Sequence, residues 1–350
     1  MLIDSPPEQS AEPSAAEQPR KRHSVRAAGL VAALAVLLVV CAASIVVGAK
    51  PVPLGDVWHG LFQNSGTGTD VLIADVRVPR TLLGLLAGVA LGLSGAVMQA
   101  LTRNPLAEPG LMGVNAGAAA AVVTATGFLG VTSLTGYVWF AFAGAAAVSV
   151  LVYVLGGGRS ATPVRLALAG TAATAALYGY VNAVQLLDAA ALDRLRFWTV
   201  GSLAGAELAT VRQVAPFLAV GVVLALLVAR PLNAMEMGDD TARALGAHLN
   251  RTRVLAMLSV TLLCGGATAA CGPIVFVGLM VPYLVRAVTG PDMRWILPYA
   301  AVLSPVLLLV SDIVGRVVAR PSELQVGIVT ALIGGPVFLH LVRRKRMAQL

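Results

Sequence analysis

The feature that most constrains this chain is a succession of long apolar stretches with almost no charge. Gly29 to Gly48, for example, are twenty consecutive residues without an acidic or basic side chain. An α-helix of about this length crosses the roughly 30 Å hydrocarbon core of a bilayer. Across all 350 residues, 57% are hydrophobic and only 12% are charged. The sequence therefore predicts an all-α polytopic membrane protein.

The lengths of the apolar stretches and the positions of breaking residues predict about ten transmembrane helices. Residues 1–26 are polar and rich in proline, so a disordered cytoplasmic tail is expected there. Residues 49–78 are expected to form a mixed loop, and one transmembrane domain extends over residues 27–345. The ten spans are expected at residues 27–48, 80–101, 112–131, 136–155, 164–187, 211–229, 253–271, 274–289, 295–318 and 324–342.

The distribution of Lys and Arg predicts that both termini lie in the cytoplasm. With this orientation seventeen basic residues fall on cytoplasmic segments, as the positive-inside rule favours. The first span is expected to be uncleaved, because the basic residues that precede it are typical of a retained cytoplasmic end. Since the basic residues flank apolar helices, the net charge of +8 is attributed to orientation, and no nucleic-acid partner is expected. The eight basic residues on external segments are Lys50, Arg77, Arg80, Arg194, Arg196, Arg212, Arg316 and Arg320.

Small residues recur along the second predicted span. Gly84, Gly88 and Gly92 are spaced every four residues and Gly95 follows, so one helix face has no side chains. Such faces let helix backbones approach closely in lipid. Tight helix packing is the preferred interpretation, and a substrate path along the glycine face is the alternative.

Charged and thiol groups inside the predicted spans are few. Asp312 is a functional candidate because an ionisable group within a span is costly. Arg316 lies one helical turn further on, however, so a structural ion pair is the preferred interpretation. Cys41, Cys264 and Cys271 have no spacing that indicates a metal site or a disulfide framework, and they are interpreted as packing residues.

A short charged segment between the sixth and seventh spans is predicted to form a helix on the cytoplasmic surface, near residues 239–247. Asp239 or Asp240 can cap its start, and Gly246 can end it. The helix is too short and too charged to cross a membrane, and it would present small residues and Leu245 to a groove on a partner. A simple connecting helix is the alternative.

Several motifs, in order along residues 27–345, resemble the FecCD-type family of ferric-siderophore and cobalamin importer permeases. Residues 242–246, Ala-Arg-Ala-Leu-Gly, resemble the coupling segment by which permeases of ATP-binding-cassette importers dock onto their ATPases. Two departures are Tyr283, where the family commonly has histidine, and Gln325, where it commonly has proline. The other matching motifs are residues 76–80, 103–110, 113–117, 197–205, 272–282, 311–316 and 323–330.

The resemblance implies a cell-membrane assembly of two permease copies, two ATPase subunits and an extracytoplasmic binding protein. The second permease copy would be identical or a paralogue. The residues implied in ATPase coupling are Asp239, Asp240, Thr241, Ala242, Arg243, Leu245 and Gly246. Arg77, Arg80 and Arg316 are implied to meet acidic residues of the binding protein, as exposed guanidinium groups that pair with carboxylates.

The turn from Gly156 to Thr162 matches a loop that serves as a gate in this family. Ser160 and Thr162 are therefore candidate gate residues, and a plain glycine linker is the alternative.

The chain itself is not expected to hydrolyse ATP or to bind a cofactor. A phosphate-binding loop needs Gly-Lys-Ser/Thr, whereas Lys21, Lys50 and Lys345 are each followed by Arg or Pro. ATP would be used by the partner subunits. The expected cargo is a ferric-siderophore complex, with cobalamin or haem as alternatives. An ion-gradient-driven secondary transporter is the alternative from another class, and it would need buried carboxylates besides Asp312.

Overall fold

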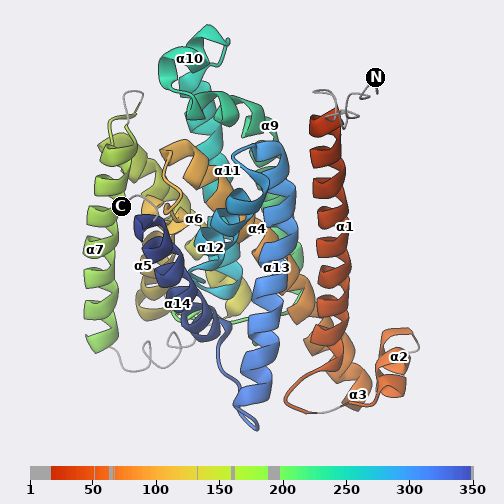
Figure 1. Ribbon diagram of the computed structural model, residues 1–350. Helices are drawn as coiled ribbons and strands as arrows, with labels where there is room; N and C mark the ends of the chain where they lie inside the picture. The colour runs from red at the N-terminus through yellow and green to blue at the C-terminus, as the bar shows by residue number, and fades with distance from the viewer. Residues whose placement is uncertain are drawn as a thin grey trace, which may run out of the picture.

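The computed structural model of the chain describes residues 17–50, 52–62, 66, 68–131, 133–158, 162–187 and 198–347. Every regular element in these ranges is a helix (Figure 1). A helix is present at each of the ten predicted spans. These helices are α1 (Glu17–Val46), α4 (Val78–Thr102), α5 (Val114–Phe128), α6 (Leu134–Leu155), α7 (Pro163–Leu187), α9 (Leu208–Glu236), α11 (Leu249–Cys271), α12 (Val277–Thr289), α13 (Met293–Val318) and α14 (Val326–Met347).

Within the described ranges, six helices are long and apolar enough to cross a membrane. They are α1, α4 with the short helical segments that precede it, α6, α9, α11 and α13. Helices α5, α12 and the apolar part of α14 are shorter. Helix α7 has sufficient length, but Thr, Gly, Tyr and Asn interrupt its apolar sequence. The chain is thus a multi-pass membrane protein. Six of its helices are long and strongly apolar, and the others are shorter or less apolar.

The first helix begins earlier than the sequence predicts. Helix α1 starts at Glu17, so residues 17–26 are helical and are not part of a disordered tail. The reason is local, because Glu, Gln, Arg and Lys in this stretch favour helix. Pro19 lies in the first turn, where its missing N–H breaks no helical hydrogen bond. The remaining tail, residues 1–16, lies outside the described residues.

The core of the bundle lies around α4, α11 and α13. Of the most apolar window in α4 and in α11, 78% of the residues are buried inside the protein, compared with 11% for α1 at the edge. The glycine face of α4 explains the close packing. A Cβ at Gly88 would collide with the backbone of Pro305 in α13, and a Cβ at Gly95 would collide with the carbonyl of Gly278 in α12. These contacts confirm the packing interpretation of the glycine pattern.

The expected loop at residues 49–78 is largely helical. It contains α2 (Leu54–Phe62), α3 (Gly68–Val71) and a π-helical turn, η1 (Leu72–Arg77), which continues directly into α4. Helix α2 is amphipathic, and its Val57 packs with Val52 and Ile73 in a small cluster separate from the main core. This second hydrophobic contact stabilises helical turns that the Pro and Gly content of the segment disfavours.

Helix α12 is shorter than predicted, because residues 272–275 are not helical and Phe276 has a positive φ of 69°.

The two ends of the bundle carry different short helices. Figure 1 places the short helix α10 (Asp239–Ala244) and the start of α1 at one end, and α2 and α3 at the other. We refer to these as the α10 end and the α2 end.

Candidate functional site

Helix α10 projects from its end of the bundle (Figure 1) and is held there by the buried Ala242 and two ion pairs of Asp239. Ala242 is fully buried, whereas the Leu245 side chain is 63% exposed. Thr241, Arg243 and Gly246 are also exposed. The helix therefore has one buried side, which anchors it, and an exposed apolar tip.

Gly238 occupies the N-cap of α10 with no side-chain hydrogen bond, so the prediction that Asp239 or Asp240 caps the helix is wrong. The reason is conformational, because the φ of 109° at this position suits glycine. Both aspartates lie in the first turn instead, where the helix dipole favours negative charge. Gly246 has a φ of 82° and ends the segment, as predicted.

Asp239 connects α10 to two core helices. One carboxylate oxygen accepts a hydrogen bond from Arg103, which follows α4, and the other accepts one from Arg253 of α11 at 2.8 Å. Asp240 forms only a local pair with Arg243 at 2.9 Å, and its side chain is fully solvated. A displacement of α10 would thus pull directly on the ends of α4 and α11.

At the α2 end, the three arginines implied in docking are buried, and the expectation that their guanidinium groups are exposed is wrong. Arg77, Arg80 and Arg316 are 4%, 6% and 2% exposed. Arg80 pairs with Asp312 at 2.7 Å and with Glu323 at 2.6 Å. We refer to these five residues as the arginine cluster.

The other two arginines of the cluster bind the end of α1. The Arg316 guanidinium pairs with Asp312 at 2.9 Å and donates to the Ser44 carbonyl and hydroxyl, each at 2.9 Å. Arg77 donates to the carbonyls of Ile45, Val46 and Lys50. The last carbonyls of a helix lack intrahelical donors, so the guanidinium groups supply what the α1 terminus needs. The unpaired carbonyls at the end of α1 therefore explain why the arginine side chains point inward.

The structural interpretation of Asp312 is confirmed by its pair with Arg316, but its second pair with Arg80 was missed. These two residues are separated by 232 positions in the sequence. One signal was available, because a carboxylate in a span needs compensation by nearby cations. Arg80, at the start of α4, and Arg316, four residues after Asp312, together satisfy that requirement.

The gate candidates are only partly described. Ser160 lies outside the described residues. Thr162 is exposed and immediately precedes α7, and its hydroxyl accepts a hydrogen bond from the Arg165 N–H at 3.3 Å. Thr162 therefore caps α7, which does not test a gating role.

Helix α7 exposes a face that is poorly suited to lipid. Tyr178 and Asn182, four residues apart and so on one side of the helix, are exposed among small residues. Tyr180 lies on the opposite side, where its hydroxyl is hydrogen-bonded to the Thr124 hydroxyl of α5 at 2.7 Å. Polar groups on membrane helices usually face a protein partner or a water-filled path. The apolar length of residues 164–187 predicts this helix, whereas its polar face was not predicted.

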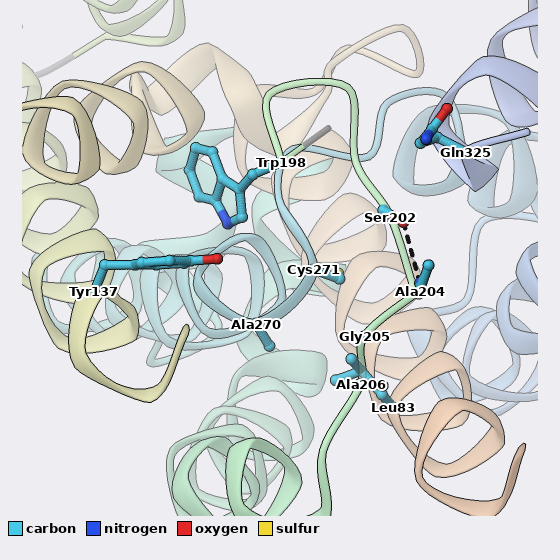
Figure 2. A pocket seen from close by; sticks show the side chains of 10 residues that line it. All are labelled: Leu83, Tyr137, Trp198, Ser202, Ala204, Gly205, Ala206, Ala270, Cys271 and Gln325. Atoms are coloured by element: carbon cyan, nitrogen blue, oxygen red, sulfur yellow. Dashed lines mark hydrogen bonds between the residues drawn. The ribbon is translucent and has the colours of Figure 1, made fainter. Parts of the chain in front are cut away.

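A cavity of about 400 Å³ lies near the α2 end, between the starts of α4, α6 and α14 and the end of α11. Figure 2 shows that the loop at residues 198–206 crosses it, with Tyr137 and Trp198 on one side and Gln325 on the other. The loop is held by a hydrogen bond from the Ser202 N–H to the Cys271 carbonyl at 2.8 Å. Trp198 and Gln325 belong to the sequence motifs described above, whereas Tyr137 had no sequence signal.

A family model described as the FecCD transport family matches residues 36–344. The chain is 45% identical over 322 residues to the ferric enterobactin transport system permease protein FepD of Escherichia coli, covering 91% of this chain and 96% of that protein. It is 37% identical over 277 residues to the hemin transport system permease protein HmuU of Yersinia pestis, covering 78% and 83% respectively.

A solved structure described as an inward-facing conformation of an ABC transporter of the metal-chelate type superposes with a TM-score of 0.78 at 26% identity. The match covers 90% of this chain and 98% of that one. The family match, the relatives and the fold agree over nearly the whole chain. The chain therefore belongs to the FecCD transport family.

Proposed function

We propose that this chain is the membrane-spanning permease subunit of an ATP-binding-cassette importer in the cell membrane, with about ten transmembrane helices and both termini in the cytoplasm. The observation that carries the proposal is α10, a six-residue helix with a buried anchor at Ala242 and an exposed apolar tip at Leu245. A short projecting helix with an exposed apolar side chain fits a groove on a partner protein. The partner is an ATPase subunit, and ATP hydrolysis takes place there.

Movement of α10 is the step that couples ATP to transport. Because Asp239 binds both Arg103 and Arg253, closure of two ATPase subunits would shift the ends of α4 and α11 together. ATP must bind one arrangement of the assembly more tightly than the other in order to bias it. The loop that contains Ser160 and Thr162 is the proposed inner gate of the path.

A second permease copy completes the path, as a homodimer or as a pair with a paralogue. The polar exposed face of α7 supports this arrangement, because Tyr178 and Asn182 would face the path between two copies and not the lipid. The cargo would cross along that face.

The α2 end is the proposed docking face for an extracytoplasmic binding protein. Arg77, Arg80 and Arg316 already have partners inside the protein. A carboxylate of the binding protein can therefore bind one of them only by replacing an internal partner. Glu323 is the accessible partner, because its side chain is 31% exposed while that of Asp312 is fully buried. An acidic side chain of the binding protein would replace Glu323 on Arg80.

The proposed cargo is a ferric-siderophore complex, on the strength of relatives whose names include ferric enterobactin and iron(3+)-hydroxamate transport. Haem and cobalamin remain alternatives, and one relative is named for hemin transport.

An ion-gradient mechanism is favoured by one observation. Glu108, in the segment between α4 and α5, is a half-buried carboxylate whose pKa is raised by desolvation, although the Phe276 N–H opposes the shift. Asp312 is less suitable for this role, because its carboxylate is already paired with two arginines.

The decisive test is uptake of iron-59-labelled siderophore by cells that express this chain with its ATPase and binding-protein partners. Replacing Leu245→Glu should abolish uptake while the protein remains folded and inserted, since a charge in an apolar interface costs several kcal/mol. Leu245→Met, which keeps an apolar tip, should retain uptake. Normal uptake and normal ATPase co-purification with L245E would contradict the coupling role. Uptake that survives ATP depletion but stops with a proton uncoupler would favour the ion-gradient alternative.

A further inference from the structure

The cavity beside Tyr137 and Trp198 is built from segments far apart in the sequence. Leu83 comes from α4, Tyr137 from α6, Trp198 and Ser202 from the loop, and Gln325 from the start of α14. Among the described residues that line it there is no Asp, Glu, Lys or Arg. Its polar groups are therefore neutral, and its walls are mainly apolar. Sites of this kind usually bind a small, largely apolar group that a few hydrogen bonds orient.

One hydrogen-bond donor in the wall of this cavity lacks an acceptor. Trp198 is 6% exposed, and its indole Nε1 is buried without a hydrogen-bond partner among the described residues. Figure 2 shows this nitrogen directed toward the same space as the Tyr137 hydroxyl. Buried indole N–H groups usually find a partner, because leaving one unpaired is costly. An oxygen atom of a bound group would supply the acceptor that the described residues do not.

The two aromatic rings define the shape of the group that fits. Tyr137 and Trp198 meet edge to face, with ring centroids 6.4 Å apart and an interplanar angle of 80°. A planar ring can stack on one and meet the edge of the other. A volume of about 400 Å³ accommodates one substituted ring, but a chelate with three such arms is too large for it.

We propose that this cavity is a subsite for one arm of the cargo, a planar ring that carries oxygen acceptors, as in a catecholate. The indole N–H and the Tyr137 hydroxyl donate to the ring oxygens. The iron is bound to these same oxygens, so it lies at the mouth of the cavity, and the other arms remain outside the cavity. This inference rests on the proposed function, and it adds a preference among chelates that the permease itself exerts.

Fluorescence of Trp198 tests the subsite directly. In the full-length chain in nanodiscs, Trp58, Trp139 and Trp295 are replaced by Phe, so that Trp198 is the remaining tryptophan. The probes are a gallium(III) tris-catecholate and a gallium(III) chelate with three aliphatic hydroxamate arms. The catecholate should change Trp198 emission saturably, with a Kd at least tenfold lower than that of the hydroxamate. No response, or an equal response to both, overturns the proposal.

Two phenylalanine variants on the same helix separate the hydroxyl from the ring. Tyr137→Phe keeps the ring and should raise the catecholate Kd about tenfold. Tyr153→Phe, further along α6 and outside this cavity, should leave it unchanged. Equal effects of the two variants would count against the subsite.

Uptake measurements distinguish failure of the subsite from failure of the proposed function. In the otherwise wild-type assembly, Trp198→Phe should raise the KM for ferric catecholate several-fold with little change in kcat, whereas Trp139→Phe should not. Catecholate uptake with an unresponsive Trp198 overturns the subsite alone. A responsive Trp198 in an assembly that takes up no chelate supports the subsite and contradicts the importer assignment.

Discussion

Asp312 is the residue around which the α2 end is organised. Its carboxylate is fully buried and accepts hydrogen bonds from Arg80 of α4 and Arg316 of α13. Arg316 in turn holds the last turn of α1. One buried carboxylate thus joins three helices, and each cation it binds also has a second partner. A buried pair of this kind adds little net stability, but it is costly to break.

Asp312→Asn should therefore destabilise the protein strongly, because two buried guanidinium groups would lose their shared counter-charge. Removing one partner of a buried pair typically costs about 3–5 kcal/mol. Thermal unfolding in detergent should show a large fall in apparent Tm and low yield of inserted protein. Asp75→Asn is the matched control, because Asp75 is exposed in the same region. An unchanged Tm in D312N would show that the cluster is not needed for folding.

Glu108 should make the stability of the protein depend on pH in a predictable direction. Burial raises its pKa above the ordinary 4.5, so the folded state binds more protons than the unfolded state between 4.5 and the raised value. Stability therefore falls as pH rises through that window. Glu108→Gln still accepts from the Phe276 N–H but cannot ionise. The Tm of the variant minus that of wild type should be small below pH 4.5 and grow toward neutral pH.

Apparent Tm values of both proteins across this pH range check the prediction. Glu207→Gln, at an exposed position, is the control and should track wild type. A Tm difference that stays constant or shrinks as pH rises would contradict the sign derived for Glu108.

At the scale of the elements, the crossing of α4 with α12 and α13 depends on glycines, which have no side chain to keep the helices apart. Gly88 and Gly92 face Pro305 and Ser304 of α13, and Gly95 faces Gly278 of α12. The helices approach so closely that backbone meets backbone. In lipid this packing supplies stability that apolar burial provides in water.

Gly95→Ala should separate α4 from α12, because the added methyl group meets the backbone carbonyl of Gly278, which cannot rotate away. Overpacking in a close-packed interior typically costs about 1–3 kcal/mol. The apparent Tm should fall by several degrees. Gly179→Ala is the control in α7, where a Cβ meets nothing within 4 Å, and it should have little effect. Equal Tm values for the two variants would contradict the close-packing argument.

For the whole molecule, the two ends of the bundle have different connections to its core. Asp239 pairs α10 with Arg103 after α4 and with Arg253 of α11, whereas the arginine cluster ties α1, α4 and α13 together at the α2 end. Helix α4 belongs to both sets. A single, closely packed helix thus extends from one set of ion pairs to the other.

Glu323→Gln tests whether the arginine cluster takes part in docking the binding protein. The variant frees one side of Arg80 without disturbing Asp312, so a carboxylate of the binding protein should bind about 1.4- to fivefold more tightly at low salt. This corresponds to the roughly 0.2–1 kcal/mol of a partly exposed pair. The gain should fade as salt shortens the range of the charges. Identical Kd values for variant and wild type at low salt would limit the cluster to a structural role. Surface plasmon resonance at two salt concentrations measures the effect.

The sequence by itself determined the membrane class, the approximate positions of the ten helices and the short helix α10, although α1 starts earlier and α12 later than predicted. These follow from apolar length, breakers and local charge, which act between neighbouring residues. Only the tertiary structure decided the direction of Arg77, Arg80 and Arg316 and the surroundings of Trp198. Exposed arginines were a reasonable expectation for an external segment, because water solvates them well. They turn inward because the α1 terminus and Asp312 present unpaired acceptors there, and those acceptors come from distant parts of the chain. Hydrogen bonds between remote segments leave no periodic trace in a sequence, since they depend on which helices meet.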